Sequence, residues 1–440
     1  MSSSKSSVYL PRMRPLPNRR SVIVSVLDVG SSKICCVIAR LTPGETDAVL
    51  PGRSHAIEVL GYGYQRSRGI KSGVVVDLDL AEQAVRLAVD GAERMAGVTV
   101  ESLIVNLTCG RLQSEIFSAG VKVARDTVSD GDIQRVLAAG SMHSLADGRA
   151  VVHALPVSYS LDGNRGIRDP RAMIGGRLGV DIHVVTSDLP PVRNLELCIN
   201  RGHLHVETLV ATPYASGLSS LVDDEAELGV ACIDMGGGTT SLSVFVERQI
   251  VHTDAIAVGG QHVTMDIARG LSTRVQIAER MKTLNGSTLP VQSDDTDILS
   301  IPSLEGDDDP GEQLPRGVLT KIIKPRVEEI LELMRDRLNA SGFAGQIGKR
   351  VVLTGGASQM TGMAEMARRV LGRNVRLGRP LGIAGMPGAA KGPAFSAAVG
   401  LLIYPQVAQI EQFEPRRTLI GPASGVGYLN RVGQWIRESF

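Results

Sequence analysis

Two short stretches of this chain, about two hundred residues apart, repeat the same turn. Val26–Ser32 reads VLDVGSS and Cys232–Gly238 reads CIDMGGG, and each is followed by further β-prone sequence. In both, an apolar run ends at an aspartate, passes through small flexible residues and resumes as a strand. Two copies in one chain predict a duplicated unit whose halves close on one anionic ligand from both sides.

The residue types in this repeat suit a phosphate ligand. Glycine and serine let the backbone approach closely, so that its N–H groups can surround phosphate oxygens. An aspartate beside phosphate is repelled unless a cation lies between them, so Asp28 and Asp234 predict Mg²⁺ held through water. The alternative is a pair of ordinary β-hairpins with glycine turns. The predicted phosphate and magnesium residues are Asp28, Gly30, Ser31, Ser32, Lys33, Asp234, Gly236, Gly237, Gly238, Thr239 and Thr240.

A third motif predicts the nucleoside end of the same site. Val351–Met360 reads VVLTGGASQM, a buried-strand run that stops at paired glycines, against which a ribose or base can lie. Upstream, Glu279 and Lys282 are one helical turn apart, where a carboxylate can accept ribose hydroxyls and a lysine stem can cover a base. Alone, that pair is more often a solvent-exposed salt bridge. The predicted nucleoside residues are Glu279, Lys282, Gly355, Gly356, Ala357 and Met360.

Composition limits the function classes. A length of 440 residues predicts two or more domains, and 47 basic against 46 acidic side chains argue against nucleic-acid binding by the body of the protein. One tryptophan leaves little for a base-stacking surface. The five cysteines lack metal spacing, which favours buried thiols in a reducing cytoplasm. We see no signal peptide and no apolar run of membrane-spanning length, so a cytoplasmic protein is expected.

Three segments read as irregular. Residues 1–20 are rich in Ser, Pro and Arg and predict a disordered basic tail, either weakly attracted to anionic lipid or merely solvated. The acidic stretch between Ser293 and Pro310 predicts a surface loop, with a magnesium site as the weaker alternative. Residues 405–425, punctuated by Pro and Gly, predict a linker.

The last fifteen residues predict an amphipathic helix. At 100° per residue, Tyr428, Leu429, Val432, Trp435, Ile436 and Phe440 fall on one apolar half, with Arg431 on the polar side and Arg437 at the boundary. Such a helix suits a lipid interface. The alternative is a helix that docks on its own domain or on a partner protein.

In this order, two phosphate hairpins, a Glu-x-x-Lys helix and a nucleoside strand resemble the actin/Hsp70/sugar-kinase superfamily. The resemblance narrows to the FtsA family of bacterial cell-division proteins through Val258–Ala268, Ile323–Glu329, Pro393–Leu401 and the last fifteen residues. It covers the chain from about Ser21 to Phe440. It implies an α/β, actin-like two-lobed fold of duplicated ribonuclease H-like domains, with an FtsA-type subdomain 1C in place of subdomain 1B.

The stretch from about Gly110 to Thr186 differs in texture, because short strands flank an amphipathic helix at Ser129–Ala139, and it predicts an inserted small α/β module. A long helix is expected over Pro325–Asn339. The resemblance also implies a domain layout. The expected parts are a tail (1–20), subdomain 1A (21–108, 187–228 and 386–404), subdomain 1C (109–186), subdomain 2A (229–263 and 326–385), subdomain 2B (264–325), a linker (405–425) and a membrane-targeting helix (426–440).

The function implied by the family is that of an ATP- and Mg²⁺-binding protein that polymerises into actin-like filaments on the cytoplasmic face of the inner membrane, at the division site. Its C-terminal helix would tether the FtsZ ring to anionic lipid, and subdomain 1C would recruit later division proteins. The FtsZ C-terminal peptide would dock on subdomain 2B at Lys324, Arg326 and Glu329, although these residues also fit a surface Arg–Glu pair. No nucleic-acid partner is expected.

Hydrolysis is expected to be weak at most, and no catalytic residue is assigned. Relatives that hydrolyse ATP well carry Glu or Gln just before the proline of the helix that follows the connecting strand, whereas this chain has Thr212 there. An MreB-like cytoskeletal filament protein is the main rival, and a sugar or acetate kinase is less favoured. An Hsp70-type chaperone would need a β-rich domain where this chain has only a linker and one short helix.

Overall fold

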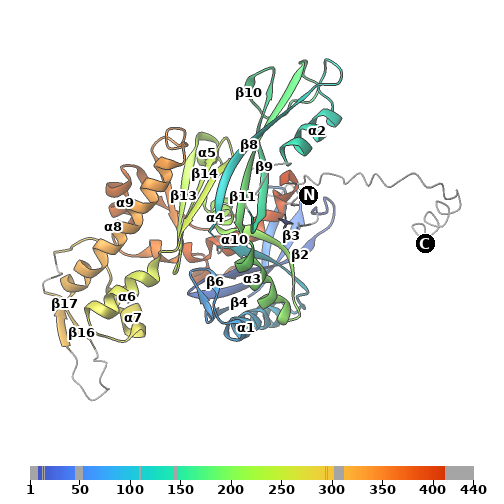
Figure 1. The fold of residues 1–440 in the computed structure, drawn as a ribbon. Coiled ribbons are helices and arrows are strands. Elements are labelled where there is room, and N and C mark those ends of the chain that lie inside the picture. Colours follow the sequence, from blue (N-terminus) through green and yellow to red (C-terminus); the bar gives the residue numbers. More distant parts are fainter. Residues whose placement is uncertain are drawn as a thin grey trace.

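The computed structural model describes residues 8–11, 13, 15–44, 53–108, 111–141, 147–292, 294, 296–301 and 312–411. The predicted C-terminal helix and most of the predicted linker lie outside these residues. The linker prediction is wrong for residues 405–411, which form short 3₁₀ turns in which Pro405 and Ala408 are buried. Three sheets form the framework, two of them in lobes that face each other and one in a smaller unit that projects from the first lobe (Figure 1).

The first lobe is built on a five-stranded sheet of order β12-β7-β2-β3-β4. Its strands are β2 (Val22–Val29), β3 (Lys33–Pro43), β4 (His55–Arg66), β7 (Ser102–Leu107) and β12 (His205–Ala211). The first three form an antiparallel meander, after which β7 and β12 add in parallel. The helices are α1 (Leu78–Ala96), α3 (Leu189–Arg201), α4 (Thr212–Ser220) and α10 (Ser396–Ile403), beside the small ribbon β5 (Ile70–Lys71) and β6 (Val74–Val75).

The second lobe repeats this topology strand for strand. Its order is β15-β14-β13-β18-β19, with an antiparallel meander of β13 (Val230–Met235), β14 (Thr240–Val246) and β15 (Gln249–Ile256), extended in parallel by β18 (Arg350–Thr354) and β19 (Asn374–Leu377). The helices are α5 (Asp223–Leu228), α6 (Gly260–Gly270), α7 (Val275–Asn285), α8 (Arg316–Ala340) and α9 (Met363–Leu371), with the ribbon β16 (Ile298–Ile301) and β17 (Glu312–Pro315). The repeated Asp-Gly turn is therefore the same β-hairpin of two equivalent sheets.

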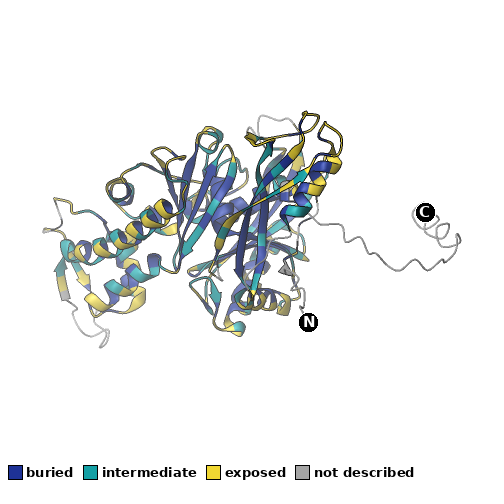
Figure 2. Cartoon of the chain, turned by 45° about the horizontal axis from the view of Figure 1, so that its top comes forward, coloured by how far each residue is buried: buried dark blue, intermediate teal, exposed yellow. Residues whose placement is uncertain are grey.

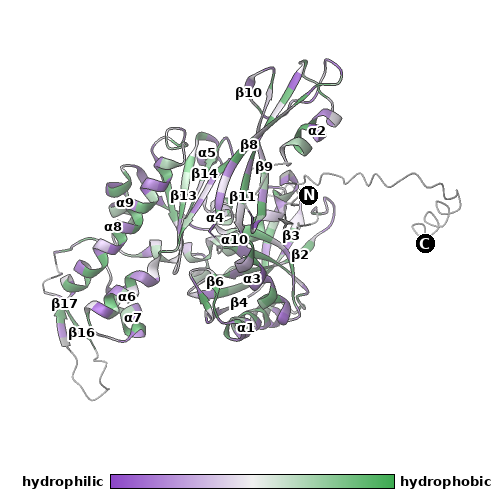
Figure 3. Cartoon of the chain, viewed as in Figure 1, coloured by the Kyte–Doolittle hydropathy of each residue, from purple (hydrophilic) through white to green (hydrophobic). Residues whose placement is uncertain are grey.

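The inserted unit has its own sheet and core. Its order is β1-β9-β11-β8, with β10 (Asn164–Ile167) paired to β9. The other strands are β1 (Val8–Tyr9), β8 (Gln113–Lys122), β9 (Arg149–Leu161) and β11 (Arg177–Asp188), covered by α2 (Asp130–Gly140). The predicted helix at Ser129–Ala139 is α2, which Ser129 caps at its N-terminus. Separate cores fill the two lobes and this unit, and the central strands of the two lobes are among the most buried and most apolar elements (Figures 2 and 3).

The prediction of a disordered tail is wrong for the part of residues 8–20 that the structure describes. β1 pairs in parallel with Ala150 and Val151 of β9, and Leu10, Met13 and Leu16 are buried in the first lobe's core. These three apolar residues recur every third position between prolines. Their burial offsets the entropy of ordering a segment whose composition otherwise reads as unstructured.

Two further expectations need correction. The acidic stretch near 293–310 is not wholly a solvated loop, because β16 lies within it and Asp294 is 6% exposed and paired with Arg316 at 2.9 Å. The helix expected from Pro325 begins nine residues earlier, at Arg316, and carries that proline in its interior.

Short 3₁₀ turns complete the described chain: η1 (Gly356–Gln359), η2 (Gly388–Ala390), η3 (Pro393–Phe395), η4 (Tyr404–Gln406) and η5 (Ala408–Glu411). Four of the five cysteines are described, and all four are buried and free, so burial raises the pKa of the Cys35 thiol, for example, to about 12. In the part of the chain that is described, none of the helices combines the length and the apolar character that crossing a bilayer requires.

Candidate functional site

A cavity of about 520 Å³ opens between the two lobes, where their equivalent hairpins face each other. It brings together 15 of the 17 residues predicted to bind phosphate, magnesium or nucleoside. Gly238 and Thr240 are not among its lining residues. Thr240 instead donates its hydroxyl to Val258 O at 2.8 Å, which supports the hairpin from behind.

The first hairpin presents Asp28 at the end of β2. This carboxylate is 6% exposed, and burial raises its pKa, an effect that Lys33 opposes. Asn106, at the end of the neighbouring β7, donates to Asp28 Oδ1 at 2.8 Å and accepts from the Val29 N–H at 2.6 Å. Asn106 thereby fixes both the carboxylate and the turn that follows it.

The second hairpin presents Asp234 in the equivalent position on β13. Burial raises the pKa of this carboxyl to about 6, with Asp28 adding to the rise and a hydrogen bond from the Ser216 hydroxyl opposing it. Gly355 reaches φ 87° directly beside it, and a Cβ there would collide with Asp234 Oδ1. The glycine pair therefore keeps the second carboxylate accessible from the cavity.

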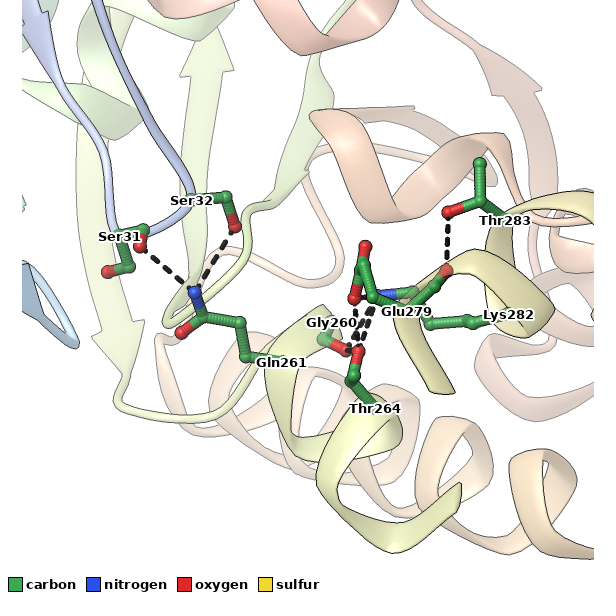
Figure 4. Close-up of polar contacts among 8 residues, drawn as sticks. All are labelled: Ser31, Ser32, Gly260, Gln261, Thr264, Glu279, Lys282 and Thr283. Carbon is green, nitrogen blue, oxygen red and sulfur yellow. Dashed lines mark hydrogen bonds and ion pairs between the residues drawn. The ribbon is translucent and has the colours of Figure 1, made fainter. Parts of the chain in front are cut away.

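The two hairpins touch across the cavity. A Cβ on Gly237 would collide with Ser32 Oγ, and a Cβ on Gly238 would collide with Ser31 Oγ. Gln261, in the first turn of α6, donates across the lobes to Ser31 O at 2.9 Å and to Ser32 Oγ at 3.4 Å (Figure 4). Glycine at these positions thus lets the two lobes come into close contact, and it also lets a ligand approach the backbone.

The Glu-x-x-Lys pair lies on α7, which packs against α6, and it lines the same cavity (Figure 4). Lys282 Nζ donates to Glu279 Oε2 at 2.7 Å, to Thr264 Oγ1 at 2.8 Å and to Gly260 O at 3.1 Å. Thr264 also donates to Glu279 and is almost fully buried. The pair is therefore held by α6 and is not a free surface salt bridge.

Lys33, at the start of β3, lies against the last part of the first lobe. Its ammonium is 2.5 Å from Ala394 O and 3.5 Å from the centre of the Phe395 ring. The side chain therefore already lies in the cavity at the end that holds the two aspartates.

Sequence reasoning missed several lining residues, some within or beside the motifs themselves and others from different elements. These are Val29, Gly73, Asn106, Thr108, Ser241, Gly260, Thr283, Gln359, Pro393, Ala394 and Ala397. Thr212, singled out from the sequence for hydrolysis, also lines the cavity and hydrogen-bonds to Thr108 Oγ1 at 2.6 Å and to Asn106 Nδ2 at 3.2 Å. The sequence signal that could have identified Asn106 and Thr108 as lining residues was their position at the end of a buried strand.

The three residues predicted to bind a partner peptide lie on α8. Arg326 is already engaged, donating to Asp266 Oδ2 at 2.6 Å and to Glu329 Oε2 at 2.5 Å. Lys324 lies two residues before it on the same helix. All residues predicted to bind membrane lie outside the described part of the chain.

Known proteins resemble this chain over nearly its full length. It is 57% identical over 432 residues to the cell division protein FtsA of Rhizobium meliloti (strain 1021), and 58% identical over 433 residues to that of Agrobacterium fabrum, with 98% of each chain covered in both cases. The chain belongs to the FtsA family of cell division proteins. It is 30% identical over 431 residues to the FtsA of Escherichia coli K12, covering 96% of this chain and 99% of that one.

Family descriptions match two parts of the chain. "Cell division protein FtsA" matches residues 231–400, and "SHS2 domain inserted in FTSA" matches residues 109–186, the same bounds as the predicted inserted module. The inserted sheet of β8, β9, β10 and β11 with α2 is therefore the FtsA-type insertion.

Solved structures confirm the actin-like two-lobed fold. The PilM–PilN type IV pilus biogenesis complex aligns with a TM-score of 0.58 at 15% identity, covering 91% of this chain and all of that one. MreB5 of Spiroplasma citri, in a structure bound to ADP, aligns with a TM-score of 0.51 at 12% identity, covering 88% and 97%. At these identities the likeness concerns the fold alone.

Proposed function

We propose that this FtsA-family protein binds ATP with Mg²⁺ between its two lobes, assembles into actin-like filaments, and tethers the FtsZ ring to the cytoplasmic face of the inner membrane at the division site. The observation that carries the proposal is the cavity itself. Two equivalent Asp-Gly hairpins face each other at one end of it, and the Glu279–Lys282 pair and the Gly355–Gly356 turn also line it. The ADP in the MreB5 structure is consistent with such a ligand between such lobes.

The residues present fit a magnesium ion held through water. Two buried carboxylates with raised pKa values lie at one end of the cavity, and a divalent cation would compensate both. The described residues hold no cluster of three or more acidic, His or Cys side chains that could bind a metal, which favours water over protein as most of the coordination shell. Asp28 and Asp234 would hold the ion, and Gly30–Lys33 and Gly236–Thr239 would hold the phosphates.

We propose that hydrolysis is slow and that ATP acts chiefly as a structural ligand. The hydroxyl of Thr212 is occupied by Thr108 and Asn106, and it is a poorer proton acceptor than the carboxylate of faster relatives. Asp234→Ala should abolish calorimetric binding of Mg–ATP and nucleotide-dependent assembly, whereas Thr212→Ala should leave both nearly intact. Equal loss in the two variants would refute a weak ATPase, and no heat from the wild type would refute the nucleotide site.

Membrane attachment is proposed through the apolar half of residues 426–440, and FtsZ attachment through Lys324, Arg326 and Glu329. One short helix contributes only reversible binding, comparable with a single lipid chain, so filament formation should strengthen it through avidity. The double substitution Trp435→Glu/Ile436→Glu should abolish sedimentation with vesicles.

Arg326→Ala should weaken binding of the FtsZ C-terminal peptide. Recruitment of later division proteins is proposed for the inserted domain.

A further inference from the structure

The N-terminal segment lies beside the point where the described chain ends. β1 pairs with Ala150 and Val151 of β9, and two residues further along that strand His153 bonds to Glu411, the last described residue, at 2.9 Å. Figure 1 labels β9, the strand that both contacts share. The N-terminal strand β1 and the last described residue, Glu411, therefore both contact strand β9 of the inserted domain.

Residues further along the N-terminal segment also lie close to the last described turns. Pro17 O is 3.3 Å from His55 Nε2, and the backbone N–H groups of Ser54 and His55 both donate to Gln406 of η4, at 2.9 and 3.1 Å. Leu16 and Ala408 are buried in the same core. Pro17 is thus linked through His55 to Gln406 in the last described turns, and Arg19 and Arg20 follow it by two and three residues.

The charge of this segment is one-sided. Residues 1–20 contain five basic side chains and no acidic one, whereas the other 420 residues carry 42 basic and 46 acidic side chains. Arg19 and Arg20 are exposed, and neither has an acidic partner within ion-pair distance among the described residues. By contrast Arg40, on the neighbouring β3, pairs with Glu58 at 3.0 Å. Two adjacent arginines therefore present uncompensated charge on an otherwise acidic protein.

We propose that the docked N-terminal segment is a second membrane contact, in which Arg19 and Arg20 bind anionic lipid headgroups beside the exit of the C-terminal tether. The inference rests on the proposed membrane function. Residues 412–425 can span at most about 50 Å, so a helix inserted in a bilayer keeps the Glu411 end of the protein near that surface. A basic patch at this end of the protein would be attracted to the same anionic membrane surface. One weak apolar anchor combined with one basic patch gives stable membrane attachment.

The test is sedimentation of the full chain with vesicles of phosphatidylcholine alone and with about 30% phosphatidylglycerol. Each basic residue near an anionic surface strengthens binding roughly fivefold, so Arg19→Gln/Arg20→Gln should weaken binding to the anionic vesicles by roughly 25-fold. Binding to neutral vesicles should stay unchanged, and the salt dependence should become shallower. Both residues are exposed, so the melting temperature should not move.

A matched control removes the same charge elsewhere. Arg269→Gln/Lys321→Gln, on exposed positions of α6 and α8 in the second lobe, should bind anionic vesicles like the wild type. The proposal is overturned if the Arg19/Arg20 variant binds anionic vesicles as the wild type does, if its loss is equal on neutral vesicles, or if the control loses as much. Trp435→Glu/Ile436→Glu tests the proposed tether separately, because failure of that variant to lose binding to neutral vesicles would count against the helix and leave the arginine comparison intact.

Discussion

Asn106 is a single buried residue on which three parts of the cavity depend. Its side chain bonds to Asp28, to the Val29 N–H and to Thr212. Asn106→Leu removes these three bonds together with a longer one to Thr108 Oγ1 at 3.5 Å, and it leaves the Val29 N–H unpaired, which costs about 1–3 kcal/mol. We therefore expect a lower melting temperature without nucleotide and weaker Mg–ATP binding by calorimetry. Thr108→Val is the control because its hydroxyl pairs with Thr212 but not with the hairpin, and equal losses in both variants would contradict this role.

Thr264 has an equivalent supporting role at the nucleoside end. Its hydroxyl accepts from Lys282 Nζ and donates to Glu279, so it orients both members of the pair. We expect Thr264→Val to weaken ATP binding by about tenfold, the cost of one hydrogen bond to a charged group. Tripolyphosphate lacks the nucleoside, so its affinity should not change. A parallel loss of tripolyphosphate binding in a calorimetric titration would show that Thr264 supports the whole lobe and not the Glu279–Lys282 pair.

At the scale of secondary-structure elements, β11 of the inserted domain packs on β15 of the second lobe, and His183 is buried close to this contact. Burial, with smaller contributions from His252 and His153, lowers the pKa of His183 from 6.5 to about 3. The unfolded chain therefore binds a proton below pH 6.5 that the folded chain excludes. The stability contributed by this residue is complete above pH 6.5 and is lost as the pH falls.

Uptake of one proton by the unfolded chain lowers the free energy of unfolding by about 1.36 kcal/mol per pH unit. Lowering the pH from 6.5 to 5 should therefore lower the free energy of unfolding by about 2 kcal/mol. We expect His183→Phe, which cannot take up this proton, to show a smaller fall in denaturant midpoint over that range. Parallel pH profiles for the two proteins would mean that other groups dominate the acid sensitivity.

Elements defined by local pattern were predictable, whereas contacts between elements were not. The two hairpins, the glycine strand end and the inserted domain all carry local signals, namely repeated turns, paired glycines and a change in texture. Gln261 and Thr264 meet their partners only because α6 lies against the β2–β3 turn and packs on α7, which no periodicity encodes. The prediction of a disordered N-terminal tail was wrong for a related reason. Three spaced apolar residues, Leu10, Met13 and Leu16, indicate an ordered segment only when the core that buries them is known.

At the scale of the whole molecule, two equivalent sheets enclose one cavity, so the angle between the lobes decides whether both hairpins reach the same ligand. Gln261 is a direct hydrogen-bond link between them, from α6 to the backbone of Ser31. Its loss should favour a wider cavity without affecting either core. The inserted domain adds another link, since Ser114 of β8 accepts from the Thr253 N–H of β15 at 2.9 Å. We therefore expect the lobes to rotate about that contact and not to separate.

We expect Gln261→Leu to accelerate dissociation of a fluorescent ATP analogue roughly fivefold, the effect of one hydrogen bond of about 1 kcal/mol. Because the residue keeps its size and lies at a helix surface, the melting temperature without nucleotide should change little. Stopped-flow displacement measures the rate, and small-angle scattering should show a larger radius of gyration in the variant. Gln276→Leu, at an exposed position in the first turn of α7, is the matched control and should release the analogue at the wild-type rate. An unchanged rate in Gln261→Leu would mean that the other contacts between the lobes, with nucleotide and Mg²⁺, hold them together without Gln261. An equal acceleration in the control would assign the effect to helix stability instead of closure.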